Sequence, residues 1–501
     1  MTTTAVTLPT PTDTFQDRRR WAVLALMGLA LCVVVLNNSA LNVAIPAMMR
    51  DLEADLPTVQ WIIDSYSIVF AGLLILAGAC SDRWGRKRMT LAGLLVFGAA
   101  SLLSAFSTEA WQLIALRGLL GAAAALVMPG TLAILLHAFS KQERAFAIAV
   151  WSGIAALGIA LGPILGGLVV ERAGWSAVFL LNVPLVGGVL IASAVLVRES
   201  ADSHRRPVDV LGALLSVVAI GALVFAVIEF GAPDTPGWIV SASAALALLA
   251  TAAVVLRLRS ARYPLIELSL LRDRRFVGAA ISNMLLFFGL AGSLFVLTQR
   301  LQFQLGMSPL TAGLAVGPIA LTVAAASACA PRLARRIGPR YAVGAGMALA
   351  TAGFLSLGWS GHDYPVIVLG LVAVGIGFGL AAPVATAVLV SAVSQDRASS
   401  GAALNDTMQE IGFALGIAVI GATLNRWYLA AAGEGGGSTL YEALTTAELL
   451  GGPAGAEIAE QAGAAFDRSG AVALTLAAVV TAAGTLIAVR LLPSAGRDRG
   501  A

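Results

Sequence analysis

About fourteen long apolar runs, separated by short polar stretches, constrain this chain more than any other feature of its sequence. A helix of roughly 20 apolar residues crosses the hydrocarbon core of a bilayer. Because unpaired backbone groups are too costly in lipid, each run is predicted to be a membrane-spanning helix. The runs lie at about 21–48, 58–79, 89–107, 111–137, 145–170, 177–197, 208–229, 238–257, 277–301, 310–332, 341–359, 365–391, 402–425 and 469–491.

The composition excludes several other classes of protein. Only 12% of the residues are charged, against roughly 25% in soluble domains, so a water-soluble fold is ruled out. The three cysteines lie in apolar runs and the three histidines are scattered, which argues against a disulfide scaffold and a histidine metal site. Neither lysine follows a glycine, so a Walker A loop is excluded and with it ATP hydrolysis. No cofactor and no metal are expected.

The distribution of basic residues predicts the orientation. An even number of spans places both termini on one side. If that side is cytoplasmic, five of the 32 Lys and Arg residues lie outside and one lies within a span, which leaves 26 inside. This positive-inside pattern predicts a multi-pass protein of the cell membrane with both termini cytoplasmic. The basic residues therefore face membrane lipid and cytoplasm rather than nucleic acid. The five outer residues are Arg50, Arg172, Arg300, Arg426 and Arg468.

A weak internal repeat indicates the domain organisation. The loops at 80–88 and 333–340 are both short and basic and share a glycine; repeated bundles of this kind are typical of secondary transporters. A monomer is expected, with a Gly/Ala-rich external loop that is flexible with some helix or, alternatively, forms a binding lid. The predicted parts are a tail at 1–20, a six-helix bundle at 21–197, a loop and two inserted helices at 198–262, a second six-helix bundle at 263–491 with the external loop at 431–468, and a tail at 492–501.

The loop after the second span carries the most specific motif. Its glycines allow a tight turn, and its aspartate can cap a helix or pair with an arginine. A charged turn that merely obeys the positive-inside rule would need neither the aspartate nor the spacing of the glycines. The loop resembles motif A of the major facilitator superfamily, and such a cluster can latch one conformation of a rocking transporter. The residues that carry the motif are Gly78, Asp82, Arg83, Gly85 and Arg86.

Two further motifs support the resemblance. Arg117, with Gly118 and Gly121, resembles motif B; an arginine inside a span is costly and is a functional candidate, although it can instead snorkel to the outer interface. A run in the fifth span resembles motif C, which in the family marks exporters. Its small residues let helices approach closely and its proline bends the span. A glycine-rich packing face is the simpler alternative. The motif C residues are Gly158, Gly162, Pro163, Gly166 and Gly167.

The resemblance narrows to the fourteen-span drug/proton antiporters and covers about residues 20–491. It rests on the end of the first span at 41–46, on Trp61 and Tyr66, and on the segments 182–184 and 405–412. The implied fold is all-α, with two six-helix bundles and a two-helix insert. The implied activity is export of hydrophobic, cationic drugs or antibiotics by proton antiport. The chain departs from the family at Asn37, where an aspartate is usual, and an asparagine cannot carry a proton.

Acidic residues inside the spans are the candidates for proton coupling. Asp406 and Glu410 are four residues apart and share one helical face. Neighbouring carboxylates raise each other's proton affinity, and a cationic drug would compete for them. Asp64 in the second span is a third candidate. The alternative for Asp406 is a structural contact with loop arginines, and Glu229 is interpreted as an interface residue.

Aromatic and amide side chains supply candidates for the substrate path. Trp61, Tyr66 and Phe413 are rings on which a planar hydrophobic drug could stack, and Asn37, at the position where the family carries an aspartate, is the amide candidate. Phe287 and Phe288 are further rings that a planar drug could stack on. The alternative is that these rings face lipid or pack between helices.

Three classes of function remain to be compared. The first is a secondary transporter, either for many hydrophobic drugs or dedicated to one endogenous metabolite, antibiotic or lipid. The second is an intramembrane enzyme, but no Ser/His pair, HExxH zinc site or Gly-x-Gly-Asp motif lies in the spans. The third is a membrane sensor or scaffold, which would not need Asp82 or carboxylates inside spans. The motifs favour the transporter.

Overall fold

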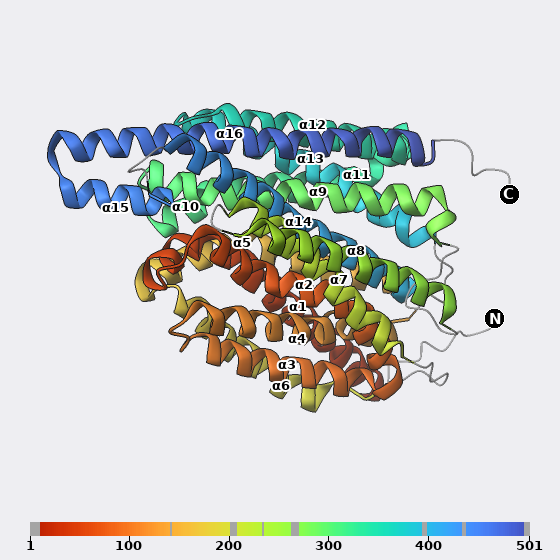
Figure 1. Cartoon of the computed structure of the whole chain (residues 1–501). Coiled ribbons are helices and arrows are strands. Elements are labelled where there is room, and N and C mark those ends of the chain that lie inside the picture. Colours follow the sequence, from red (N-terminus) through yellow and green to blue (C-terminus); the bar gives the residue numbers. More distant parts are fainter. Residues whose placement is uncertain are drawn as a thin grey trace, which may run out of the picture.

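The computed structural model describes residues 11–140, 143–200, 208–232, 235–261, 270–392, 398–432 and 437–494. Throughout these ranges the regular structure is helical. Two helix bundles lie against each other, with a hairpin of two further helices in front of them (Figure 1). This confirms the predicted all-α fold with two six-helix bundles and a two-helix insert.

The first bundle is formed by the N-terminal six helices. In it α1 packs along α5, α2 along α4, and α3 along both α4 and α6. Helix α1 begins within the segment 1–20 that was predicted to be a tail; residues 1–10 lie outside the described part. The helices are α1 (Pro11–Asp51), α2 (Leu56–Trp84), α3 (Arg86–Ser104), α4 (Ala110–Ala138), α5 (Arg144–Ala173) and α6 (Ser176–Leu196).

The second bundle follows the insert. Its long helices pack pairwise, α12 on α13 and α16, and α9 on α14. One of its spans is broken into α10 and α11 by a turn before Gly317. The elements are η1 (Leu270–Arg272), α9 (Arg274–Gln299), a π-helical turn η2 (Arg300–Gln304), α10 (Pro309–Ala315), α11 (Gly317–Ile337), α12 (Pro339–Trp359), α13 (Tyr364–Ser391), α14 (Ala398–Ala432), α15 (Leu440–Leu450) and α16 (Gly452–Leu491).

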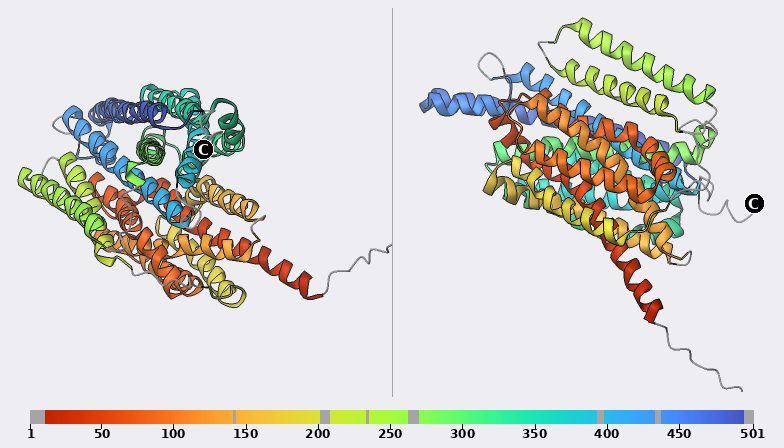
Figure 2. Two further views of the ribbon diagram at one scale, coloured as in Figure 1. Left: turned by 90° about the vertical axis from the view of Figure 1, so that its right-hand side faces the viewer. Right: turned by 90° about the horizontal axis from the view of Figure 1, so that it is seen from below.

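The insert is a helical hairpin on one flank of the molecule. Helix α7 (Val210–Gly231) packs on α2 of the first bundle and on α14 of the second, and α8 (Gly237–Ser260) packs on α7. The hairpin therefore lies over the line where α2 and α14 meet, as the view from below shows (Figure 2). We call this line the α2–α14 seam.

The lengths of the helices agree with the predicted spans. Within the described residues, thirteen helices are long and apolar enough to cross a membrane. Helix α5, with 30 residues, fills the remaining place in the first bundle. The chain therefore makes fourteen passes in alternating directions, so that the start of α1 and the end of α16 lie at the same end (Figure 1). We call this the proximal end and the opposite one the distal end.

The region 431–468, predicted to be a flexible loop with some helix, contains two helices at the distal end. Helix α15 and the first turns of α16 pack against each other. Leu440 and Phe466 are buried there, and the Phe303 and Tyr441 rings lie 5.9 Å apart between centroids. The helices are ordered because their alanines favour helix and their apolar side chains cover the end of the second bundle.

Arg300 differs from its predicted place. The sequence places it among the outer loop residues, but its side chain is fully buried in the second bundle. It donates to the Leu357 carbonyl at 2.6 Å and to the Ser360 hydroxyl at 3.2 Å, and it lies 3.8 Å from Asp467. The sequence did not predict this burial, because the acceptors for Arg300 come from the end of a different helix, α12.

Candidate functional site

A buried polar cluster lies between α1, α2, α4 and α14, and its centre is Arg117. This side chain is fully buried. It donates to Asn37 Oδ1 at 2.9 Å and to Asn38 Oδ1 at 3.0 Å. On α2 it donates to the Ile62 carbonyl at 3.0 Å. Its guanidinium also lies 4.4 Å from the centre of the Tyr66 ring. Arg117 is therefore fixed in the bundle interior, which rules out the snorkelling alternative.

Carboxyl groups from both bundles lie within electrostatic range of Arg117. Asp64 on α2 is fully buried, and neither of its oxygens has a hydrogen-bond partner among the described residues. Glu410 on α14 lies beside Ser67 and within range of Arg117 and of Asp406. An ionised carboxylate without donors is costly in such a place. The charge of Arg117 stabilises the ionised form of Asp64, and that of Glu410 is stabilised by the neighbouring Ser67 hydroxyl as well as by Arg117.

Asp406 lies one turn from Glu410 and is held by a network of amides. Asn405 donates to Asp406 Oδ1 at 3.1 Å, and Asn283 of α9 donates to Asn405 at 2.7 Å and to Thr386 of α13 at 3.0 Å. The network connects three helices of the second bundle. The sequence interpretation did not include Asn283 and Thr386, although a lone asparagine within an apolar span is a signal that could have indicated Asn283.

The aromatic candidates lie in different places. Tyr66 is buried beneath Arg117, and Phe413 is half-buried on α14 near Glu410. The rings of Phe287 and Phe378 pack edge to face, 4.9 Å apart. Trp61 lies away from the cluster and packs on Phe225 of the insert, with centroids 5.6 Å apart. Thus the structure brings Asn37, Asp64, Tyr66, Arg117 and Glu410 together and leaves Trp61 outside.

The motif C glycines are places of close helix approach. A Cβ atom on Gly162 would lie 1.8 Å from the Ser39 hydroxyl and one on Gly166 would lie 2.7 Å from the Ala40 carbonyl, both on α1. Gly158 faces Cys32 in the same way. Gly167 instead faces α10, where its Cβ would lie 2.3 Å from the Pro309 carbonyl. Motif C therefore packs α5 on α1 and also brings the two bundles together at the distal end.

Hydrogen bonds join the bundles in the distal half. Glu171 at the end of α5 accepts from the Ser308 hydroxyl at 2.6 Å and from the Leu310 N–H at 3.1 Å. Gln60 of α2 donates to the Ile417 carbonyl of α14 at 2.8 Å. Together with the approach at Gly167, these contacts close the distal end.

Motif A lies at the proximal end and its contacts remain within the first bundle. Asp82 pairs with Arg86 at 2.8 Å, and the N–H groups of Lys87 and Arg88 donate to Glu199, just beyond α6. Gly78 packs on Pro129 of α4. Arg83 makes no polar contact with any described residue. Among the described residues, the polar contacts of motif A therefore do not reach the second bundle in this conformation.

The turn of motif A requires a glycine at position 85. Its φ is +111°, and a Cβ there would lie 2.8 Å from the Glu199 carboxyl group. Gly85→Ala is expected to lower the free energy of unfolding by about 1–2 kcal/mol because an L-residue is strained at this φ. Thermal melting in detergent would measure this, with Gly187→Ala as the control, since nothing lies within 4 Å of Gly187. A Gly85→Ala protein with the same melting temperature as the Gly187→Ala control would contradict the prediction.

Comparison with known proteins decides the family. The sequence profile described as Major Facilitator Superfamily matches residues 27–417. The chain belongs to the major facilitator superfamily. This confirms the resemblance found in the three motifs, and because the superfamily consists of transporters, it also confirms a transporter rather than an enzyme.

Relatives within the superfamily cover nearly the whole chain. The multidrug efflux pump LfrA of Mycolicibacterium smegmatis is 32% identical over 95% of this chain and 97% of its own. The methyl viologen resistance protein SmvA of Salmonella typhimurium is 31% identical over 92% of this chain and 95% of its own. The methylenomycin A resistance protein of Streptomyces coelicolor is 33% identical over 89% of this chain and 94% of its own.

Solved structures of the superfamily share the fold at low sequence identity. A bacterial homologue of the human lysosomal transporter Spinster, in an inward-facing and unoccupied conformation, has a TM-score of 0.67 and is 15% identical. It covers 95% of this chain and 98% of its own. The comparison supports the two-bundle architecture in a transporter that is remote in sequence.

Proposed function

We propose that this protein exports hydrophobic, cationic compounds across the cell membrane in exchange for protons, and that Asp64, Asp406 and Glu410 bind the protons. The observation that carries the proposal is the position of Arg117, a buried cation within electrostatic range of Asp64 from the first bundle and of Glu410 from the second. Motion of one bundle against the other would change the distance from Arg117 to Glu410 while Asp64 stays beside Arg117, so protonation and conformation are coupled at this point.

The departure at Asn37 fits this arrangement. Asn37 accepts a hydrogen bond from Arg117 but cannot neutralise it, whereas an aspartate there would form an ion pair. The charge of Arg117 therefore remains available to the carboxylates on α2 and α14. In this chain, protons are therefore bound by Asp64 and by the Asp406–Glu410 pair instead of by a residue at position 37 of the first span.

The order of events follows from the charges. With the proximal end cytoplasmic, as the basic loops indicate, a lipophilic cation enters toward Asp406 and Glu410 and replaces their protons. Binding then favours closure of the proximal end, where motif A engages, and opening at Gly167 and Glu171. Protons that reach the carboxyl groups from the distal side release the cation there. The protons move inward and the cation moves outward.

The substrate class is supported by the carboxyl groups and by the relatives. Methyl viologen, named in the description of one relative, is a dication, and ionised carboxyl groups can pair with its charges. The relative named for methylenomycin A resistance favours a second candidate, a dedicated exporter of one antibiotic or endogenous metabolite. The same cluster would then couple protons to a single substrate.

Transport by purified protein in liposomes tests the proposal. A pH gradient is imposed and uptake of a fluorescent lipophilic cation is followed. Glu410→Gln and Asp406→Asn are each expected to lower gradient-driven uptake at least about tenfold, because removing a charged partner costs roughly 1.5–3 kcal/mol. Glu460→Gln, on the exposed distal part of α16, is the matched control and should transport normally.

The outcomes separate the two candidates. If the gradient drives uptake and the substitutions abolish it, antiport is established and its carriers are located. If uptake of the cation ignores both the gradient and the substitutions, the polyspecific export of cations is wrong for this protein. A dedicated exporter of another substrate then becomes the leading hypothesis.

A further inference from the structure

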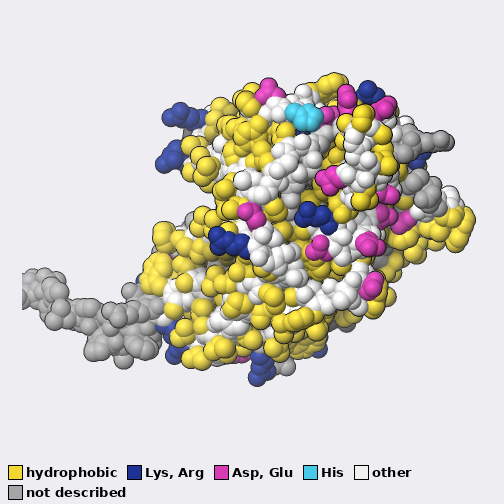
Figure 3. Space-filling model, turned by 90° about the vertical axis from the view of Figure 1, so that its left-hand side faces the viewer, with side chains coloured by type: hydrophobic (Ala, Val, Ile, Leu, Met, Phe, Trp, Pro, Cys, Tyr) yellow, Lys and Arg dark blue, Asp and Glu magenta, His cyan; other side chains and the backbone are white. Residues whose placement is uncertain are grey.

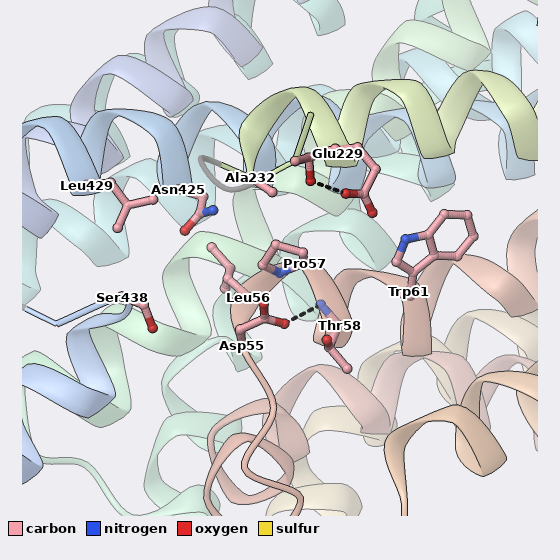
Figure 4. A pocket seen from close by; sticks show the side chains of 11 residues that line it. Asp55, Leu56, Pro57, Thr58, Trp61, Glu229, Ala232, Asn425, Leu429 and Ser438 are labelled. Carbon is pink, nitrogen blue, oxygen red and sulfur yellow. Dashed lines mark hydrogen bonds between the residues drawn. The ribbon is translucent and has the colours of Figure 1, made fainter. Parts of the chain in front are cut away.

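A cavity of about 250 Å³ lies at the distal end of the α2–α14 seam, and its lining does not include Arg117, Asp64 or Glu410. It is lined by all three parts of the molecule (Figure 4). Asp55 and Trp61 come from the start of α2, Glu229 from the end of α7, and Asn425 and Leu429 from α14. Because the first bundle, the insert and the second bundle each supply part of the wall, the cavity exists only when they are assembled.

The acidic side chains that line the cavity, Glu229 and Asp55, accept hydrogen bonds but are not paired with a basic side chain among the described residues. Glu229 accepts from the Thr235 hydroxyl at 2.5 Å, and Asp55 caps α2 by accepting from the Thr58 N–H at 2.9 Å. In the described part of the chain neither carboxylate forms an ion pair. Figure 4 shows the Glu229 side chain beside the Trp61 indole. Two formal negative charges therefore face a small space that also has an aromatic wall.

Asn425 adds a buried acceptor. Its side chain is only 4% exposed, and its amide nitrogen donates to the Gly231 carbonyl at 3.1 Å. This fixes the orientation of the amide, and its oxygen has no hydrogen-bond partner among the described residues although it lines the cavity. A buried acceptor oriented in this way is normally satisfied by a ligand or a water molecule.

Arg426 forms no ion pair with these carboxylates. Arg426 follows Asn425 directly but lies against Phe230, with its guanidinium 4.6 Å from the ring centre and a hydrogen bond of 3.1 Å to the Phe230 carbonyl. The view onto the distal face shows acidic side chains gathered toward the edge where the insert lies (Figure 3). This part of the distal face therefore attracts cations.

We propose that this cavity binds the ammonium head group of an organic cation. Carboxylates pair with the charge, and the Trp61 face adds a cation–π contact, for which tryptophan is the best side chain. The rigid packing of Trp61 on Phe225 holds that face in place. At about 250 Å³ the space is below the roughly 300–1,000 Å³ of sites that enclose a whole drug. Only the head group enters, and an attached apolar chain extends outside it.

The same chemistry has two sources, a free organic cation and the ammonium group of a lipid such as phosphatidylethanolamine. Neither depends on the proposed proton coupling, because the cavity does not include Asp64, Asp406 or Glu410. The cavity would be a second binding site for cations, at the distal end of the protein. Its occupation would also hold the insert to both bundles.

Direct binding tests the proposal without transport. Radiolabelled tetraethylammonium is titrated onto the purified full-length protein in nanodiscs of phosphatidylglycerol. We expect saturable binding that Glu229→Gln and Trp61→Leu each weaken about tenfold, in line with the loss of a charged partner. Glu229→Asp should retain most of it. Glu448→Gln, an exposed carboxylate on α15, is the matched control.

Two further measurements determine where the probe binds and whether the natural ligand is a lipid or a free cation. Glu410→Gln removes binding at the central cluster, and the binding that remains in this variant should still be weakened by Glu229→Gln. If Glu410→Gln abolishes binding while Glu229→Gln does not, the probe lies in the central cluster and the proposal is overturned. Binding that ignores Glu229→Gln and Trp61→Leu, or an absence of saturable binding, overturns it as well. Replacing part of the lipid with phosphatidylethanolamine distinguishes the sources. Weaker apparent binding then identifies lipid as an occupant, and unchanged binding identifies the free cation.

Discussion

Replacing Arg117 with methionine is expected to lower proton-driven transport at least about tenfold. The side chain is fully buried and donates to Asn37, Asn38 and the Ile62 carbonyl. Methionine fills similar space but leaves these acceptors unpaired, and removing one partner of a buried charge cluster commonly costs about 3–5 kcal/mol. It also removes the positive charge that Asp64 and Glu410 share.

A loss of folding is separated from a loss of coupling by measuring exchange. Counterflow of the same cation between the two sides needs no net proton movement, so Arg117→Met should retain counterflow while losing gradient-driven uptake. Arg117→Lys keeps the charge but cannot span the same set of acceptors, and an intermediate rate is expected. Wild-type gradient-driven uptake by the methionine variant would show that Arg117 has no part in coupling.

Replacing Gly167 with leucine is expected to force the distal end apart and to reduce transport about tenfold. The Cβ alone would lie 2.3 Å from the Pro309 carbonyl, and because this atom belongs to the backbone, no side-chain movement relieves the clash. Packed interfaces respond to such overpacking by shifting rather than compressing. The bundles would therefore favour the conformation that is open at the distal end.

Distances between spin labels measure this shift. Labels are placed on the exposed positions Arg172 and Thr311, after the three native cysteines have been replaced. The distance distribution should move to longer values in Gly167→Leu. The control is Gly188→Leu, because Gly188 is exposed on α6 and nothing lies within 4 Å of a Cβ there. A Gly167→Leu protein with the distances of the control would contradict the role of Gly167 in distal closure.

The fold could be predicted from the sequence because lipid leaves few alternatives. An apolar run long enough to span must be helical, and an even number of spans fixes which ends meet. The ends of the helices were predicted less well. Helix α1 begins at Pro11 and α16 at Gly452, beyond their apolar cores. At the start of both helices, alanine-rich or polar residues continue the helix. The predicted bounds followed the apolar run alone and so began too late.

The members of the site could be predicted, but not their arrangement. Asp64, Arg117 and Glu410 stand out because charges within spans are costly. Their meeting depends on the register of α2 against α14, which is set by contacts such as Gln60 with the Ile417 carbonyl. Such a contact between residues far apart in sequence leaves no local pattern. For the same reason Asn38, which also binds Arg117, was not recognised as part of the site.

The position of the insert makes the two flanks of the transporter unequal. Helix α7 contacts both α2 and α14 and closes that flank, whereas on the other flank α5 meets α10 and α11 directly. Among the described helices, none covers the line between the bundles on the α5–α11 flank. A compound dissolved in the bilayer would therefore approach that line from the α5–α11 flank, because the insert covers the other one.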